Sequence, residues 1–279
     1  MRSPALAVSG VDEALLLAVA DDYGPTAAED APDGCRLFFP DATHRDQARD
    51  AILGAWPDAV VVALEVDDED WARRSQEGLA PITVGRLTIL PAPPGLPDLP
   101  GLPALPGLVI VPSTGFGTGH HPTTRLCLEA LQELDLTGRS LLDVGTGSGI
   151  LAIAGRLLGA RLAIGIDNDA DAVRSAMDNL AINTGVSGVE FRVNDLSAPA
   201  GLPASDVVTA NLTGTLLRRA APLLLGAVQP GGFLIVSGLL ASEHDDVAEA
   251  LGAVHPVWEA AEDEWVALMF SFPLTHRSR

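Results

Sequence analysis

Short apolar runs alternate with longer amphipathic stretches between residue 108 and the end of the chain. The runs are rich in Val, Ile and Leu and suit buried strands, and the stretches between them have helical length. The expected strands are 141–144, 162–166, 189–193, 207–210 and 233–237, and the expected helices are 150–158, 170–183, 214–228 and 242–251. This alternation predicts an α/β fold with a doubly wound, Rossmann-like, mostly parallel sheet. Runs 254–258 and 265–272 lie close together and are expected to close the sheet as an antiparallel pair.

The first part of the chain has a shorter alternation of the same kind. Residues 1–66 combine brief apolar runs with amphipathic stretches, which predicts a small α+β domain with an antiparallel sheet. Residues 67–107 are expected to be a linker, with an acidic helix start followed by a spacer. Pro and Gly recur every two or three residues over 91–107, and that composition does not hold a regular helix or a central strand. The α/β domain then takes residues 108–279.

The most informative segment is 141–149, which reads LLDVGTGSG. Its glycines stand between an expected strand and an expected helix, and Asp167 ends the next expected strand. A tight glycine turn of this kind brings backbone N–H groups up to a nucleotide, while the acid on the neighbouring strand binds ribose hydroxyls. Gly145, Gly147 and Asp167 are therefore candidate cofactor-binding residues.

The spacing of the glycines separates two cofactor classes. Dinucleotide sites favour Gly-x-Gly-x-x-Gly, whereas this chain has Gly-x-Gly-x-Gly with Asp143 two residues ahead of Gly145. A carboxylate at that strand end would repel a pyrophosphate and attract the ammonium group of S-adenosyl-L-methionine. Asp143 is therefore also a candidate cofactor-binding residue, and the expected cofactor is S-adenosyl-L-methionine.

A second glycine-rich segment, residues 115–124, precedes this turn. Pro122 suits the first turn of a helix through 126–134, where Thr123 and Thr124 would present N–H groups and hydroxyls to an anionic carboxylate. The paired His120 and His121 have no third ligand nearby in the sequence, so no metal site is expected.

Composition narrows the choice of partners and compartment. The formal charge is −20, which disfavours direct binding to nucleic acid and favours a basic partner. Two cysteines are too few for a disulfide framework, the start of the chain lacks an export signal, and the apolar runs are too short to cross a bilayer. We expect a cytoplasmic monomer that does not bind membranes.

Five motifs in the same order make residues 108–270 resemble a known family, the bacterial PrmA-type methyltransferases of the eleventh protein of the large ribosomal subunit. The motifs are FGTGHHPTT at 116–124, LDVGTGSGILAIA at 142–154, IGID at 164–167, ANL at 210–212 and EWVAL at 264–268. Two departures stand out. The chain has VPSTG at 111–115 where the family usually has Asp-Pro-Gly, and its Pro-rich linker is longer.

The resemblance implies a class I S-adenosylmethionine-dependent protein-lysine N-methyltransferase that modifies lysine side chains and the amino terminus of its substrate. It implies that residues 1–66 recognise the ribosomal protein and that the linker lets this domain reposition. It also implies that the cofactor is contacted by Thr124, Gly145, Asp167 and Asn211. His121 and Thr123 are implied as neighbours of these contacts.

Asn211 is the candidate catalytic residue. It ends the fourth expected parallel strand, where ligands bind in such sheets, and its side-chain carbonyl could accept a hydrogen bond from an incoming amine. A purely structural turn is the alternative interpretation. Enzymes that methylate base amines usually carry Asn-Pro-Pro and an aromatic residue here, whereas this chain has Asn-Leu-Thr-Gly at 211–214. Asn194 and Asp195 could bracket the adenine or simply cap a loop.

Transfer to lysine requires a neutral amine aligned with the methyl group. With an ordinary pKa near 10.4, a lysine is neutral in only about 0.04% of molecules at pH 7, a deficit of roughly 4.6 kcal/mol. Desolvation and the positive sulfonium lower that pKa, whereas carboxylates raise it. We therefore expect the acidic surface to steer the substrate from a distance and the target pocket itself to be poor in carboxylates.

Two alternatives stay open from the sequence. The chain could methylate a different protein or a small amine, or it could be an inactive cofactor-binding interaction module. The presence of Thr124, Asp167 and Asn211 argues against the inactive module.

Overall fold

The computed structural model describes residues 2–11, 16, 19–20, 23–25, 27–31, 34–67, 80–91, 107–111, 119–195, 201–252 and 255–273. The chain divides into two compact units, residues 1–77 and 78–279. Each unit has a hydrophobic core of its own.

The first unit contains, in its described part, an antiparallel sheet of four strands in the order β2-β3-β1-β4. The strands are β1 Arg2–Ser9, β2 Ala27–Ala31, β3 Gly34–Phe38 and β4 Val60–Asp67. The expected small α+β domain is thereby confirmed. Strand β2 was not expected, because its sequence AAEDA lacks the β-branched and aromatic residues that favour strands.

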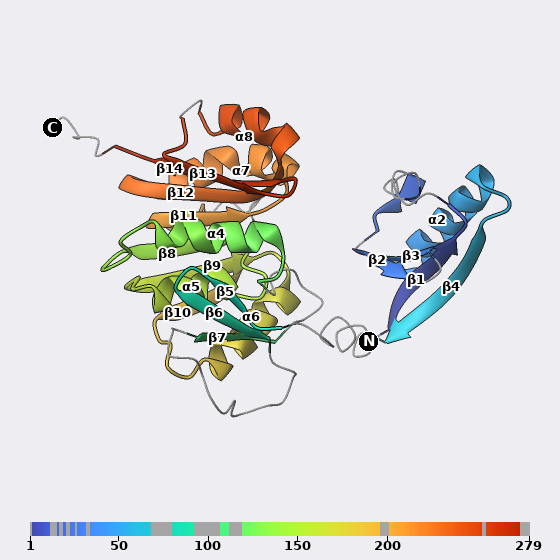
Figure 1. The fold of residues 1–279 in the computed structure, drawn as a ribbon, viewed down its shortest axis with the longest axis horizontal. Helices are drawn as coiled ribbons and strands as arrows, with labels where there is room; N and C mark the ends of the chain where they lie inside the picture. The colour runs from blue at the N-terminus through green and yellow to red at the C-terminus, as the bar shows by residue number, and fades with distance from the viewer. Residues whose placement is uncertain are drawn as a thin grey trace. The chain divides into compact units, whose positions relative to one another are not determined.

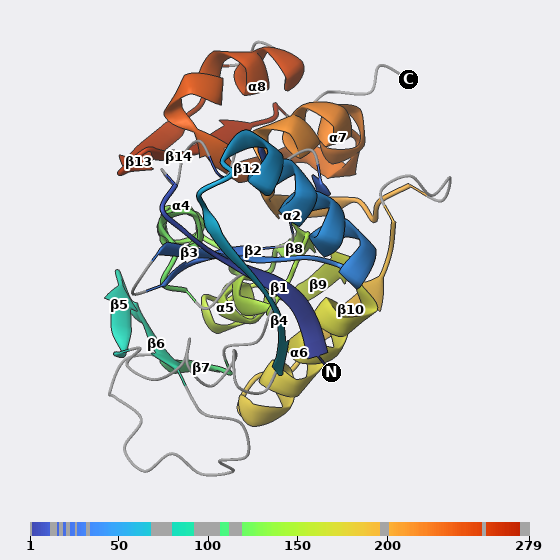
Figure 2. The ribbon, with the colours of Figure 1, turned by 90° about the vertical axis from the view of Figure 1, so that its right-hand side faces the viewer.

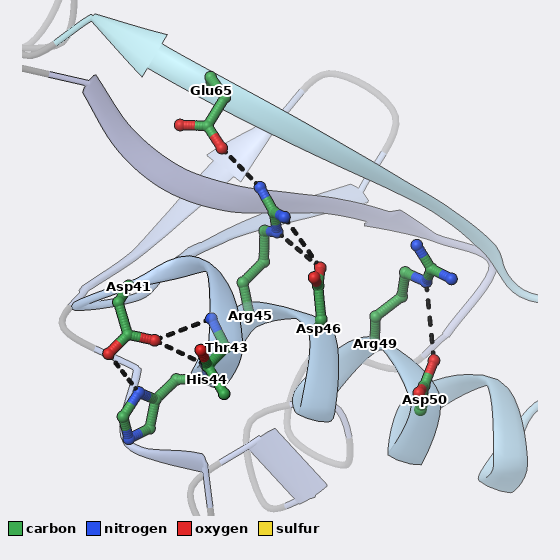
Figure 3. A network of polar contacts seen from close by, with 8 residues as sticks. All are labelled: Asp41, Thr43, His44, Arg45, Asp46, Arg49, Asp50 and Glu65. Atoms are coloured by element: carbon green, nitrogen blue, oxygen red, sulfur yellow. Dashed lines mark hydrogen bonds and ion pairs between the residues drawn. The ribbon is translucent and has the colours of Figure 1, made fainter.

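Helix α2, Ala42–Ala55, covers this sheet. Its buried Ala48 and Ile52 share a core with Leu6 and Leu37 of the strands. The carboxylate of Asp41 accepts hydrogen bonds from the first-turn N–H groups of Thr43 and His44, which caps the helix start (Figure 3).

An ion pair also ties helix α2 to the edge strand β4. Arg45 Nη1 lies 2.7 Å from Glu65 Oε1, and Arg45 Nε donates to Asp46 Oδ1 at 2.9 Å (Figure 3). One guanidinium therefore bridges two elements of the unit.

The second unit is built on a sheet that has seven strands in the described residues, in the order β10-β9-β8-β11-β12-β14-β13. Figure 1 shows this sheet running through the unit, with β10 at one edge and the hairpin β13–β14 at the other. The strands are β8 Ser140–Val144, β9 Leu162–Asp167, β10 Val189–Val193, β11 Ser205–Asn211, β12 Val228–Leu240, β13 Trp258–Glu262 and β14 Trp265–Ser271. Strands β8 to β12 are parallel, and β14 pairs antiparallel with both β12 and β13.

Helices cover both faces of this sheet. Helices α4, α5 and α6 pack on one face, and α7 and α8 pack on the other. They span α4 Pro122–Gln132, α5 Ile150–Leu157, α6 Ala170–Ile182, α7 Gly214–Ala227 and α8 His244–Ala250. Strand residues alternate between the two cores, as Leu141 and Leu142 do, so the doubly wound prediction is confirmed.

One expectation about element bounds needs correction. The penultimate strand runs over Trp258–Glu262 and not over 254–258, because β13 and β14 form a tight hairpin in which Glu262 pairs with Trp265. Asp263 turns the chain there at φ 52°. Residue 254 of that expected strand and most of residues 11–20 lie outside the described residues.

The expected linker also contains regular structure. Strands β5 Ile82–Val84, β6 Leu87–Pro91 and β7 Gly107–Ile110 form a separate small sheet, teal to green in Figure 2. They belong to the second unit, because their apolar side chains are buried in the same core as α4 and α5. The acidic segment 68–70 and the Pro/Gly-rich stretch 92–106 lie outside the described residues.

No helix in the part of the chain that the structure describes is long and apolar enough to span a bilayer.

Two helical glycines should respond to alanine in opposite ways. A Cβ on Gly155 of α5 would lie 2.3 Å from Cδ2 of Leu141, which is itself buried, whereas a Cβ on exposed Gly226 of α7 meets nothing within 4 Å. We expect Gly155→Ala to lower the free energy of unfolding by about 1–3 kcal/mol through overpacking. Gly226→Ala should raise it by about 0.5–1 kcal/mol. Urea unfolding of both variants checks this, and equal effects would contradict the packing described for α5.

Candidate functional site

The glycine turn after β8 is held against the end of β9. The N–H groups of Gly145 and Thr146 both donate to the Ile166 carbonyl, each at 2.9 Å. Gly145 has a φ of 72°, and a Cβ there would lie 2.4 Å from Cδ2 of Leu212, the residue after Asn211. Only glycine satisfies both the backbone conformation and this close approach.

Asp167 stands at the end of β9, directly beside the turn. Gly147 N–H donates to Asp167 Oδ2 at 2.9 Å, and Asp169 N–H donates to Oδ1 at 3.1 Å. Each carboxylate oxygen keeps a further lone pair for a hydroxyl. Asn194 N–H donates to the Asp167 carbonyl at 2.7 Å, so the 194–195 segment lies next to this acid. The turn and Asp167 therefore meet as the sequence leads one to expect.

Asp143 faces the interior of the sheet. Its side chain is 1% exposed, and it accepts hydrogen bonds from Thr146 Oγ1 at 2.6 Å and Thr209 Oγ1 at 2.7 Å. Burial raises the pKa of Asp143 to about 6, and the hydroxyl donors only partly offset that effect. Both of its oxygens therefore have internal partners, and its attraction of an ammonium group stays a prediction.

His121 caps helix α4, and Pro122 occupies the first helical position as expected. Thr123 N–H donates to His121 Nδ1 at 3.4 Å, and the Thr123 hydroxyl lies 2.8 Å from the same nitrogen. Nδ1 is therefore an acceptor, which assigns the ring proton to Nε2. Burial, and secondarily the charge of Arg125, lowers the pKa of His121 and favours the neutral ring.

The first N–H groups of α4, which were expected to face an anion, already have acceptors inside the protein. The N–H of Thr123 is used by His121 Nδ1, and that of Thr124 donates to the His121 carbonyl at 3.1 Å. Both threonines are buried, with exposed fractions of 4% and 2%. The two amides therefore have partners inside the protein.

Asn211, at the end of β11, reaches across to helix α4. Its Nδ2 lies 3.5 Å from Thr124 Oγ1, a contact between residues 87 positions apart. This hydrogen bond brings the candidate catalytic residue together with a candidate cofactor residue.

The candidate residues lie at the carboxyl ends of β8, β9, β10 and β11 or at the start of α4. Strand β8 lies between β9 and β11, which is where the strand order reverses direction. Open α/β sheets bind ligands in the crevice at that point. Within the described residues, no group of three His, Cys, Asp or Glu side chains could hold a metal ion.

Two threonines that hold Asp143 were not among the residues expected at the site. Thr146 lies inside the glycine turn, and Thr209 interrupts the apolar strand β11 with a fully buried polar side chain. A polar residue in the middle of a buried strand needs a partner, and that is the signal that could have revealed it.

The arrangement of sheet, turn and acid defines a class I S-adenosylmethionine-dependent methyltransferase. The model of the family "Ribosomal protein L11 methyltransferase (PrmA)" matches residues 41–272. The chain therefore belongs to this family, as the sequence motifs indicated.

Individual relatives agree with the family match. A ribosomal protein L11 methyltransferase of Pseudomonas paraeruginosa is 42% identical over 208 residues, 73% of this chain and 68% of the relative. One from Vibrio cholerae is 43% identical over 189 residues, 66% of this chain and 61% of the relative. The crystal structure of ribosomal protein L11 methylase from Lactobacillus delbrueckii subsp. bulgaricus matches with a TM-score of 0.60 at 24% identity. The match covers 70% of this chain and 98% of the methylase chain, and it supports the fold.

The buried carboxyl of Asp143 makes stability depend on pH. Its pKa is raised from 3.8 to about 6, so the folded protein binds this proton more tightly than the unfolded chain. Its contribution is present below pH 3.8 and is lost as pH rises to 6, about 3 kcal/mol in all. We expect Asp143→Asn to remove this loss, so that the variant gains stability relative to the native chain between pH 4 and 6, measured by urea unfolding.

Asp206→Asn is the matched control with the opposite sign. Burial raises the pKa of Asp206, but hydrogen bonds from the N–H and hydroxyl of Ser140 outweigh it, and the net shift is downward. Its stabilisation exists at neutral pH and is lost as pH falls. If the free energy of unfolding of the native chain and of Asp143→Asn varied with pH in parallel, the raised pKa of the buried Asp143 carboxyl would be contradicted.

Proposed function

We propose that this chain transfers methyl groups from S-adenosyl-L-methionine to lysine side chains, and to the terminal amine, of ribosomal protein L11. Family membership supports the substrate, since the relatives are named for it. The observation that carries the proposal is the contact between Asn211 and Thr124, which joins the end of β11 to the start of α4 beside the glycine turn.

The residues at the crevice fit the methyl donor. Asp167 would bind the ribose hydroxyls, and the turn at Gly145 and Gly147 would lie against the amino-acid part, with His121 and Thr123 lining the site from α4. Asp143 would act from beneath, through Thr146 and through its charge. The cofactor supplies an electrophilic methyl group on a positive sulfonium.

Asn211 would orient the amine that is methylated. Its amide nitrogen is directed toward Thr124, so the carbonyl end of the amide can accept a hydrogen bond from an amine N–H. An amine held this way keeps its lone pair available for in-line displacement. The following residues, Leu212 and Thr213, offer no aromatic face for stacking a base, which favours an aliphatic amine.

One carboxylate close to the start of α4 is compensated by an arginine. Glu262 is paired with Arg125, with Oε2 at 3.0 Å from Nε, so its negative charge is compensated by a guanidinium. Arg125 also donates to the His120 carbonyl. A compensated carboxylate raises the pKa of a nearby lysine less than a free one does.

The net charge of −20 suits a basic ribosomal substrate. We assign recognition of that substrate to the first unit, and we assign the reaction to the cytoplasm, where ribosomal proteins are made. A monomeric state without direct nucleic-acid or membrane binding stays a prediction.

Methylation of purified L11 with labelled S-adenosyl-L-methionine tests the substrate directly. We expect methyl groups on L11 lysines by mass spectrometry and one labelled small basic protein when a ribosomal lysate replaces L11. Labelling of a different protein or of small amines only would reassign the substrate. Cofactor binding without any labelling would indicate the inactive binding module.

Asp167→Ala should weaken binding of S-adenosylhomocysteine by about 1.5–3 kcal/mol, the usual contribution of hydrogen bonds to a charged group. Asp171→Ala is the matched control, because Asp171 is exposed and pairs with Arg174 on the surface of α6. Isothermal titration calorimetry measures both affinities. Unchanged affinity in Asp167→Ala refutes the ribose assignment.

Asn211→Ala should reduce turnover more than cofactor affinity. The reason is that the side chain is assigned to the amine, while Asp167 and the glycine turn hold the cofactor. Steady-state kinetics on L11 together with calorimetry separates the two effects. Equal losses in both measurements would show that Asn211 only supports the cofactor.

A further inference from the structure

A buried amide connects the glycine turn to the end of β7. Asn179 of α6 is 0% exposed, and its Nδ2 donates to the Ser148 carbonyl at 2.9 Å. Its Oδ1 accepts from Val111 N–H, also at 2.9 Å. Ser148 belongs to the turn after β8, and Val111 directly follows β7. One side chain therefore joins segments that are 37 positions apart in the sequence.

The second of these segments is the end of β7, a strand of the small sheet β5-β6-β7. Ser148 is itself 2% exposed, so the hydrogen bond from Asn179 is shielded from water. Loss of the Asn179 amide would remove a donor from the Ser148 carbonyl and an acceptor from the half-buried Val111 N–H.

A neighbouring asparagine provides an internal comparison. Asn183 lies one helical turn later, and its amide bonds both polar groups of Val109, with Val109 N–H at 2.9 Å and the Val109 carbonyl at 2.7 Å. It also donates to the Asn179 carbonyl at 2.7 Å. Asn183 thus links β7 to the end of α6. Of the two asparagines, Asn179 is the one that also hydrogen-bonds to the glycine turn.

We propose that Asn179 is a positioning residue that fixes the glycine turn relative to the end of β7, and thereby sets the affinity for the methyl donor. The inference rests on the proposed cofactor site. A buried amide that is bonded at both its nitrogen and its oxygen has one orientation, so it couples the position of Ser148 to that of Val111.

Calorimetry with S-adenosylhomocysteine, combined with urea unfolding, tests this on Asn179→Ala and Asn183→Ala. Both variants lose buried hydrogen bonds and should be less stable. At a temperature where both remain folded, we expect affinity at least tenfold weaker in Asn179→Ala and within about threefold of native in Asn183→Ala. Equal losses in the two variants, or native affinity in Asn179→Ala, would overturn the proposal.

Hydrogen exchange on the native protein provides a second test that needs no variant. Adding S-adenosylhomocysteine should slow exchange of the Val111 amide together with that of Gly147, and should leave the Val109 amide nearly unchanged. Slowing at Gly147 without slowing at Val111 would contradict the link. Failure of the native protein to bind S-adenosylhomocysteine would overturn both the cofactor site and this proposal. Binding by the native protein with unchanged affinity in Asn179→Ala would overturn this proposal alone.

Discussion

The site depends on the hydrogen bonds that hold the glycine turn against the end of β9. Two turn amides share the Ile166 carbonyl, and a third, from Gly147, fixes the Asp167 carboxylate. These contacts join adjacent strands of a parallel sheet that is buried on both faces. The acid and the turn are therefore placed by rigid elements, which limits the entropy lost when a ligand is bound.

The same region contains a carboxylate that is costly to bury. Asp143 lies beneath the turn, and its charged form is disfavoured by burial even though Thr146 and Thr209 donate to it. A positive ligand above the turn would favour that charged form. In the free protein, ionisation of Asp143 therefore lowers the free energy of unfolding at neutral pH. A sulfonium bound above the turn would stabilise the ionised form, so the buried charge favours ligand binding and disfavours folding.

Much of the large unit could be predicted from the sequence, because most of the parallel strands contain a short apolar run and are separated by helices of ordinary length. Asp167 and Asn211 were placed at strand ends for the same reason. Strands β5 and β6 were not predicted, because they are short and precede a Pro-rich stretch, so the whole segment was interpreted as a linker. The inward orientation of Asp143 and the bridge made by Asn179 were not predictable, because they depend on contacts with residues 31 to 68 positions away.

A crystal structure of the chain with S-adenosylhomocysteine tests the central claim most directly. The account predicts the ribose hydroxyls within hydrogen-bond distance of the Asp167 carboxylate and the amino-acid part against the glycine turn. Binding at another place, or a nicotinamide nucleotide taking this crevice in preference, would contradict it.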